Sequence, residues 1–275
     1  MEPVVKWAGG KRQLLPEIKP IIRSQQYETF VEPFLGGGAV LLSLMPEKAI
    51  VNDCNEELMN LYKQIMENPD ELISKLEEHK KKNDSGYYYA IRQQDRTEEY
   101  QHMSDCERAA RMLYLNKTCY NGLYRVNSHG YFNSPYGKYA NPDIVSRDRI
   151  LELSSYLNAN DVTLECGDYK KILENVPDDA FVYIDPPYLP TSESSNFTGY
   201  TSGGFGYAEH VQLKELCESL RDRGVPFLQS NSDCAEVREL YRDFEIIEVE
   251  ACRCINSVGS RRGSVGEVLI RYSGQ

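Results

Sequence analysis

Seven short runs rich in β-branched and aromatic residues recur along the chain, and stretches of helical character separate them. The runs cover residues 29–31, 49–51, 162–164, 180–184, 226–228, 245–249 and 267–270. Strands that alternate with helices are typical of α/β proteins, in which helices cover a mostly parallel sheet. The sequence therefore predicts a Rossmann-like α/β fold.

The 275 residues suffice for one large domain or two small ones. Residues 56–150 differ in character from the rest, because a charged helical stretch over 56–82 gives way to a Tyr-, Asn- and Gly-rich stretch over 116–141. We expect 56–150 to be an inserted domain, with 1–55 and 151–275 forming one discontinuous domain. The Ser-, Thr- and Gly-rich residues 189–206 predict a mobile loop.

No feature of the sequence indicates a membrane segment, export or a metal site. The longest strongly apolar stretch, 39–45, is far shorter than a membrane span, and the chain opens without a basic and apolar leader. The eight cysteines are scattered, with no C-x-x-C pair. We therefore expect a cytoplasmic protein with reduced thiols and no metal.

Charge is unevenly distributed along a chain whose net charge is −11. Residues 108–142 contain no acid but five cations, namely Arg108, Arg111, Lys117, Arg125 and Lys138. Residues 251–266 contain no acid but Arg253, Arg261 and Arg262. Such segregation can bring a phosphate backbone to one face of an acidic protein, although chance clustering on a solvated face explains it equally well.

A strand that runs into Gly36-Gly37-Gly38 and then into an apolar helix resembles a nucleotide-binding turn. The dinucleotide fingerprint is incomplete, because Leu41 stands where the third glycine would be, and this disfavours a dehydrogenase. Asp53 follows the next strand, where a carboxylate can accept hydrogen bonds from both ribose hydroxyls. The pattern fits a nucleoside cofactor without pyrophosphate, and also a plain connection between strand and helix.

The only tryptophan lies near the N-terminus, in Trp7-Ala8-Gly9-Gly10-Lys11. This is not a phosphate-binding loop, because it lacks the first glycine and Arg12 replaces the Ser or Thr that would bind magnesium. Trp7 is equally consistent with a core anchor.

Asp185-Pro186-Pro187-Tyr188 directly follows an apolar strand, whose carboxyl end opens into the ligand crevice of a parallel sheet. An exocyclic amine such as adenine N6 is a poor nucleophile, because its lone pair is delocalised into the ring. The Asp185 carboxylate and the Pro186 carbonyl can accept its two hydrogens, and Tyr188 offers a face for stacking. A rigid turn would explain the prolines but not the acid or the aromatic residue.

Five motifs together resemble the Dam-type DNA adenine-N6 methyltransferases of the D12 class, alpha group. They are residues 7–11, 32–38, 52–55, 167–169 and 185–188, and the similarity covers essentially the whole chain. The resemblance implies a methyltransferase sheet with an inserted target-recognition domain, and S-adenosyl-L-methionine as methyl donor. The residues that it assigns to the donor are Trp7, Lys11, Phe34, Gly36, Asp53, Asp168, Tyr169 and Asp185. It implies that a flipped adenine contacts Asp185, Pro186 and Tyr188.

The resemblance also assigns a DNA-recognition hairpin to residues 120–137, a turn-rich ribbon suited to the major groove. Arg125 matches the position that reads the guanine of GATC, Leu123 and Pro135 match positions that contact neighbouring bases, and Tyr120 and Asn121 belong to the same motif. Some of these tyrosines are equally consistent with a buried face. Residues 196–200 resemble a loop that orders over the bound base, and Arg253, Arg261 and Arg262 are candidate phosphate contacts or solubility residues.

The residues and the resemblance together predict an enzyme that methylates adenine N6 in double-stranded DNA, within GATC. We expect it to act in the cytoplasm of a bacterium, or to be encoded by a phage, and to have a cognate restriction endonuclease as a further partner. Methylation of RNA adenine, methylation of DNA cytosine N4, and an inactive DNA-binding relative remain alternatives. The four histidines have no paired spacing, and the chain has no Pro-Cys dipeptide, which excludes the covalent route to cytosine C5.

Overall fold

The computed structural model describes residues 1–189, 205–252 and 264–274, which form two compact units. The first unit consists of Met1–Gly10, Gly36–Glu47 and Asp53–Gly167, and the second of Lys11–Leu35, Lys48–Asn52 and Asp168–Gln275. The division into catalytic and recognition domains at residues 55 and 150 remains a prediction about function. No helix in the described part of the chain is long and apolar enough to cross a membrane.

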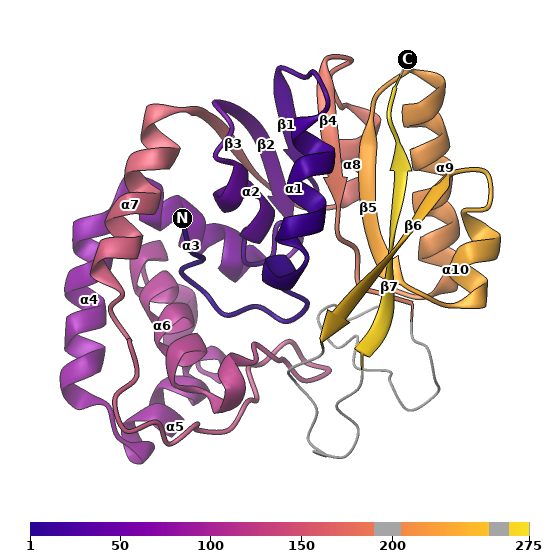
Figure 1. The fold of residues 1–275 in the computed structure, drawn as a ribbon. Helices are drawn as coiled ribbons and strands as arrows, with labels where there is room; N and C mark the ends of the chain where they lie inside the picture. Colours follow the sequence, from indigo (N-terminus) through magenta and orange to yellow (C-terminus); the bar gives the residue numbers. More distant parts are fainter. Residues whose placement is uncertain (190–204, 253–263, 275) are drawn as a thin grey trace. The chain divides into compact units, whose positions relative to one another are not determined.

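Seven strands form one sheet in the order β3-β2-β1-β4-β5-β7-β6 (Figure 1). Their bounds are Thr29–Glu32 (β1), Lys48–Asp53 (β2), Asp161–Cys166 (β3), Ala180–Ile184 (β4), Phe227–Ser232 (β5), Glu245–Cys252 (β6) and Ser264–Tyr272 (β7). Strands β2, β1, β4 and β5 pair in parallel, whereas β7 pairs antiparallel with both β5 and β6. The predicted α/β fold with a mostly parallel sheet is confirmed, and each predicted run overlaps a strand, with Pro226 alone outside one.

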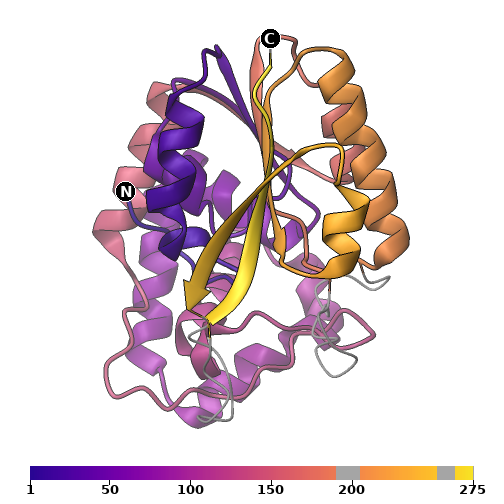
Figure 2. The same cartoon turned by 45° about the vertical axis from the view of Figure 1, so that its right-hand side comes forward.

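Helices cover both faces of the strands in the second unit. They are η1 (Lys11–Gln13), α1 (Leu15–Arg23), α8 (Tyr169–Glu174), α9 (Tyr207–Asp222) and α10 (Ala235–Leu240). A hydrophobic core lies between α8, α9 and α10 and alternate residues of β4 and β7, such as Val182 and Ile270. Figures 1 and 2 show α1 on the opposite face, where Tyr27 contacts Phe30 and Phe181.

The order of the strands reverses at β1, whose neighbours are β2 on one side and β4 on the other. In open α/β sheets, ligands bind outside the carboxyl ends of the strands at such a reversal. Here β1 ends at Glu32 and β4 ends at Ile184. The topology therefore predicts a ligand site at the residues that follow these two strands.

The first unit is mostly helical. Its helices are α2 (Ala39–Leu44), α3 (Glu56–Glu67), α4 (Pro69–Lys82), α5 (Ser85–Gln93), η2 (Gln94–Arg96), η3 (Glu98–His102), α6 (Asp105–Thr118), η4 (Tyr120–Gly122) and α7 (Arg147–Ala159). Helix α6 begins at a capping box made by Ser104 and Glu107, and all of its residues from 109 to 118 are buried. Because α3, α4 and α5 pack against it, α6 is the central helix of this unit and fixes the start of the segment 120–137.

Candidate functional site

Asp185 directly follows β4, which is buried along its whole length. The Nζ atom of Lys11 lies 2.8 Å from Oδ1 of Asp185, and the two side chains are 6% and 20% exposed. Burial raises the pKa of Asp185, the Lys11 ammonium opposes this rise, and the Glu267 carboxylate adds to it. The second unit therefore holds a desolvated carboxylate balanced by one cation, and such a group is a strong hydrogen-bond acceptor.

Tyr188 lies beside the same pair. The Lys11 ammonium is 4.6 Å from the centre of the Tyr188 ring, a cation–π distance. The Tyr188 hydroxyl donates a hydrogen bond of 2.7 Å to Oε2 of Glu267 on β7. The sequence singled out Lys11, Asp185 and Tyr188, but it did not single out Glu267. The available signal was an acid next to the apolar run Val268-Leu269-Ile270.

The backbone around Pro186 and Pro187 is held at both ends. Before the prolines, the Tyr183 hydroxyl is 2.8 Å from Oγ of Ser230 in the buried part of the sheet. After them, Oγ of Ser232 donates a hydrogen bond of 2.8 Å to the Leu189 carbonyl. Since each proline also fixes its own φ angle, the carbonyl of Pro186 belongs to a rigid segment.

Two of the predicted donor-site residues, Phe34 and Tyr169, lie together in the second unit. Their ring centres are 4.8 Å apart, and Phe205 completes the cluster at 5.9 Å from Phe34 and 5.7 Å from Tyr169. Phe34 is only partly buried. Asp168 caps α8, since its Oδ1 accepts a hydrogen bond of 3.0 Å from the Lys170 amide. Tyr169 and Phe205 are buried in the hydrophobic core, so the partly buried Phe34 is the ring of this cluster that can offer an aromatic face to a purine.

The other predicted donor-site residues, Trp7, Gly36 and Asp53, lie together in the first unit. The Gly36 amide donates to Oδ2 of Asp53 and the Asn55 amide donates to Oδ1, both at 2.9 Å. Burial raises the pKa of Asp53, and these amide bonds partly offset the rise. An oriented carboxylate at the end of a strand fits ribose hydroxyls, which are hydrogen-bond donors.

Gly36 is required for a reason that the sequence did not reveal. Its φ angle is +51°, and a Cβ atom there would lie 2.8 Å from Cδ1 of Trp7. The indole of Trp7 therefore packs directly on the glycine turn. This contact explains Gly36 by packing against Trp7, and it does not support the expectation that the glycine lets a ligand approach. The same indole stacks on Tyr124, with 5.2 Å between the ring centres.

The predicted recognition segment forms a short irregular hairpin after α6. Bridges link Cys119 with Tyr136 and Val126 with Phe132. Tyr120, Asn121, Arg125 and Pro135 are exposed, and Leu123 is partly exposed. Nε of Arg125 donates a hydrogen bond of 2.7 Å to Oδ1 of Asn133. This bond holds the guanidinium by one edge, which suits presentation of its other donors to a base.

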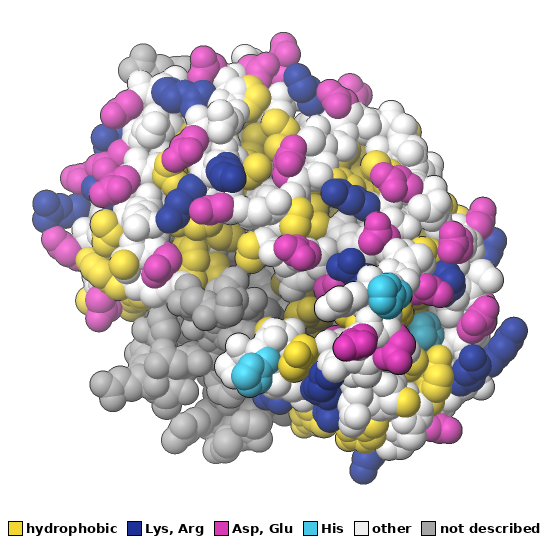
Figure 3. All heavy atoms as spheres, turned by 180° about the vertical axis from the view of Figure 1, so that it is seen from behind, with side chains coloured by type: hydrophobic (Ala, Val, Ile, Leu, Met, Phe, Trp, Pro, Cys, Tyr) yellow, Lys and Arg dark blue, Asp and Glu magenta, His cyan; other side chains and the backbone are white. Residues whose placement is uncertain are grey.

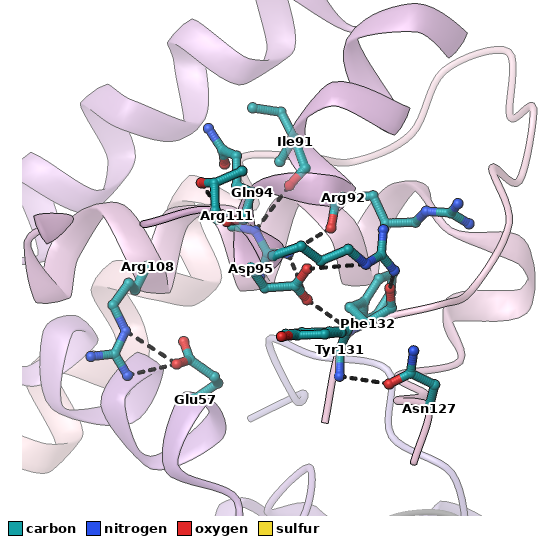
Figure 4. Close-up of polar contacts among 12 residues, drawn as sticks. Glu57, Ile91, Arg92, Gln94, Asp95, Arg108, Arg111, Asn127, Tyr131 and Phe132 are labelled. Atoms are coloured by element: carbon teal, nitrogen blue, oxygen red, sulfur yellow. Dashed lines mark hydrogen bonds and ion pairs between the residues drawn. The ribbon is translucent and has the colours of Figure 1, made fainter. Parts of the chain in front are cut away.

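A buried ion pair anchors this hairpin to the helices (Figure 4). Oδ2 of Asp95 lies 3.1 Å from the guanidinium of Arg111 and accepts a hydrogen bond of 2.7 Å from the Phe132 amide. Arg111 also donates to the carbonyls of Ile91 and Arg92, each at 2.9 Å. The network joins α5, α6 and the returning limb of the hairpin.

The same network corrects the interpretation of the acid-free window 108–142. Arg108 pairs with Glu57 at 2.6 Å, Arg111 pairs with Asp95, and Lys117 is buried. Only Arg125 and Lys138 of its five cations are exposed, so most of the positive charge does not face solvent. Figure 3 shows one face of the molecule, on which basic and acidic side chains are interspersed.

Several residues considered in the sequence analysis lie outside the described residues or outside the candidate site. Residues 196–200 and Arg253, Arg261 and Arg262 lie outside the described residues. His79 is partly buried and His210 is buried, and burial lowers the pKa of each to about 4. In residues 1–189, 205–252 and 264–274, no group of His, Cys, Asp or Glu side chains is arranged to bind a metal ion.

A mostly parallel α/β sheet, with an acid and an aromatic ring after its central strand, defines an enzyme of the Rossmann-like methyltransferase class. The family model for D12 class N6 adenine-specific DNA methyltransferases matches residues 7–255, and the chain belongs to this family. It is an adenine-specific DNA methyltransferase.

Three relatives match this chain over nearly their whole length. The type II methyltransferase M1.LlaDCHI of Lactococcus lactis subsp. cremoris is 44% identical, over 100% of this chain and 96% of the relative. The type II methyltransferase M.MjaIII of Methanocaldococcus jannaschii is 38% identical, over 98% of each chain. The DNA adenine methylase of Escherichia coli K12 is 35% identical, over 98% of this chain and 94% of the relative.

Proposed function

We propose that this enzyme transfers a methyl group from S-adenosyl-L-methionine to N6 of an adenine that has rotated out of duplex DNA. The observation that carries the proposal is the cluster of Lys11, Asp185 and Tyr188 at the carboxyl end of β4. It places a hydrogen-bond acceptor beside an aromatic face, which is what an extruded adenine requires.

In this proposal, the amino group of adenine donates one hydrogen to Oδ2 of Asp185 and the other to the carbonyl of Pro186. Two acceptors localise the nitrogen lone pair, which the purine ring otherwise delocalises, and aim it at the donor. Tyr188 stacks on the base, and Lys11 keeps Asp185 ionised through the contact at Oδ1. These side chains orient the base without a covalent intermediate on the protein.

The residues proposed for the donor are Trp7, Lys11, Phe34, Gly36, Asp53, Asp168, Tyr169 and Asp185. When bound, S-adenosyl-L-methionine supplies an electrophilic methyl group on a sulfonium. The chain supplies a carboxylate oriented by two amides and an aromatic cluster, and both fit a nucleoside.

The hairpin 120–137 would read the target in the major groove, with residues 56–150 acting as the recognition domain. Arg125 would bind O6 and N7 of the guanine in GATC, while Tyr120, Asn121, Leu123 and Pro135 contact neighbouring bases or phosphates. The exposure of Arg125 and its bond to Asn133 support this role. The enzyme would act in the cytoplasm with a cognate restriction endonuclease, and the name type II methyltransferase of two relatives supports such a partner.

The decisive experiment incubates the enzyme with labelled S-adenosyl-L-methionine and a duplex that contains GATC. Duplexes with single base changes, a single strand and an RNA of the same sequence serve as comparisons. Digestion of the product should give N6-methyladenine from the GATC duplex only. Recovery of N4-methylcytosine, or preferential methylation of the RNA, would overturn the proposal, and no methylation of any substrate would indicate an inactive relative.

A further inference from the structure

One carboxylate outside the predicted site touches the residues proposed for catalysis. Oε2 of Glu267 accepts a hydrogen bond of 2.7 Å from the Tyr188 hydroxyl, across 79 positions of the chain. Glu267 is only 9% exposed. A short hydrogen bond between a hydroxyl and a buried carboxylate is charge-assisted and stronger than a neutral one.

The sheet register explains how Glu267 reaches this position. Glu267 on β7 lies opposite Ser232 on β5. Ser232 binds the Leu189 carbonyl, one residue beyond Tyr188, and the Leu189 amide lies 3.4 Å from Oδ1 of Asn231. Neighbouring positions of β5 and β7 thus hold the backbone after Tyr188 and the far end of its ring.

A buried carboxylate at this position stabilises the fold less than an apolar residue would. Burying an ionised group costs free energy that an apolar residue would not cost, and β7 continues with Val268, Leu269 and Ile270, which are fully buried. The Glu267 charge also raises the pKa of Asp185, which works against keeping that acid ionised. A gain in catalysis would explain why the chain carries this charge.

We infer that Glu267 is a positioning residue of the methylation reaction, which fixes the Tyr188 ring by its hydroxyl so that the ring presents its face to the target adenine. The inference rests on the proposed function, in which Tyr188 stacks on that base. A ring held at both its Cβ atom and its hydroxyl cannot tilt away from the stacking plane. Since small misplacements of a reacting group slow a reaction steeply, the bond acts on the rate of methyl transfer.

Three variants separate the effect of the Glu267 charge, the effect of its hydrogen bond with Tyr188, and the effect of losing a carboxylate elsewhere in the sheet. Glu267→Leu removes the acceptor, Glu267→Gln keeps an acceptor without charge, and Glu245→Gln alters an exposed carboxylate on β6 that pairs with Arg271. Single-turnover methylation should fall about 10- to 100-fold in Glu267→Leu and less in Glu267→Gln, and it should not change in Glu245→Gln. Affinities for S-adenosylhomocysteine and for the duplex should stay within about twofold of the parent enzyme. A normal rate in Glu267→Leu would overturn the inference.

A double-mutant cycle with Tyr188→Phe tests whether Glu267 acts through the hydroxyl. Once the donor is absent, adding Glu267→Leu or Glu267→Gln should have little further effect on the rate. Multiplicative losses would mean that Glu267 acts elsewhere, and that result would also overturn the inference. Glu267→Gln serves in the cycle if the leucine variant fails to fold.

The pH profile tests separately whether the Glu267 charge acts on Asp185. The charged and titratable groups around Asp185 are Lys11, Tyr183, Tyr188 and Glu267. Because the Glu267 charge raises the pKa of Asp185, Glu267→Gln should shift the acidic limb of the rate to lower pH. An unshifted limb together with multiplicative losses in the double-mutant cycle would overturn the inference.

The proposed function fails separately from this inference. If the parent enzyme methylates adenine and Asp185→Asn does not, the proposed function stands whatever the Glu267 variants do. If the parent enzyme yields no N6-methyladenine, the proposed function fails first.

Discussion

The ammonium of Lys11 and the carboxylate of Asp185 lie 2.8 Å apart, although Lys11 begins η1 and Asp185 follows β4. The lysine is nearly buried, so each charge depends on the other for compensation. The same ammonium lies over the ring of Tyr188. One cation therefore organises both residues that the proposed reaction places against the adenine.

Asp185→Asn should abolish methylation while the protein still binds its duplex. The amide keeps its oxygen for Lys11 but presents an NH2 donor in place of Oδ2 to the adenine amino group, so we expect a loss of about 100-fold or more in the single-turnover rate. Rapid quench with labelled donor measures the rate, and a gel-shift assay measures binding. A variant within about threefold of the parent rate would contradict the role of Asp185.

Arg125→Ala should relax discrimination at a single guanine. Loss of a bidentate contact to O6 and N7 is expected to cost about 1 to 3 kcal/mol between the cognate and the altered base pair. The measurement is kcat/KM for GATC against duplexes changed at each position. Lys138→Ala, which removes another exposed cation of the same segment, is the control and should weaken all duplexes alike. Unaltered preference in Arg125→Ala would assign the guanine to another residue.

Asp95→Ala should destabilise the fold, because it leaves the buried Arg111 guanidinium without its carboxylate and the Phe132 amide without its acceptor. Breaking such a pair costs about 3 to 5 kcal/mol of unfolding free energy. Urea titration measures the change. Asp70→Ala is the matched control, because Asp70 is 85% exposed and its contact with Arg147 is 3.9 Å long. A loss for Asp95→Ala as small as that of the control would show that the network contributes little.

Lys117→Met should change how stability depends on pH. Burial lowers the pKa of Lys117 from 10.5 to about 8. Between these values the unfolded chain binds a proton that the folded chain does not, so the stability of the parent protein rises with pH across this window. The advantage of the variant should be largest below pH 8, at most about 3 kcal/mol, and should shrink toward pH 10.5. Denaturation at pH 7, 8.5 and 10 tests this, and a difference that is constant with pH would contradict it.

The sequence was most informative where chemistry is carried by adjacent residues. Asp185, the prolines and Tyr188 form one contiguous motif after a recognisable strand, so their placement could be predicted. Glu267 could not be found in this way, because its contact with Tyr188 depends on β7 pairing antiparallel with β5. Hydrophobic periodicity indicates that a strand exists but not which strand lies beside it.

The charge pattern was less reliable for a similar reason. Arg108 and Arg111 lie in a window without acids, yet their partners Glu57 and Asp95 come from outside that window. Ion pairs form between helices that are distant in sequence, so a local count of charges overestimates what reaches the surface. The glycine turn shows the same limit, since the neighbour that requires Gly36 is the side chain of Trp7.

The position of β7 between β5 and β6 also bears on how the enzyme matures. Translation proceeds from the amino end, so β5 and β6 leave the ribosome before the strand that separates them in the finished sheet. A nascent chain that already contains Asp185 and Tyr188 still lacks Glu267 and the pairing that aligns it. If Glu267 positions Tyr188 as inferred, full methylating capacity is acquired late in synthesis, because a chain that stops before residue 264 retains residues 185–188 without the strand that supports Tyr188.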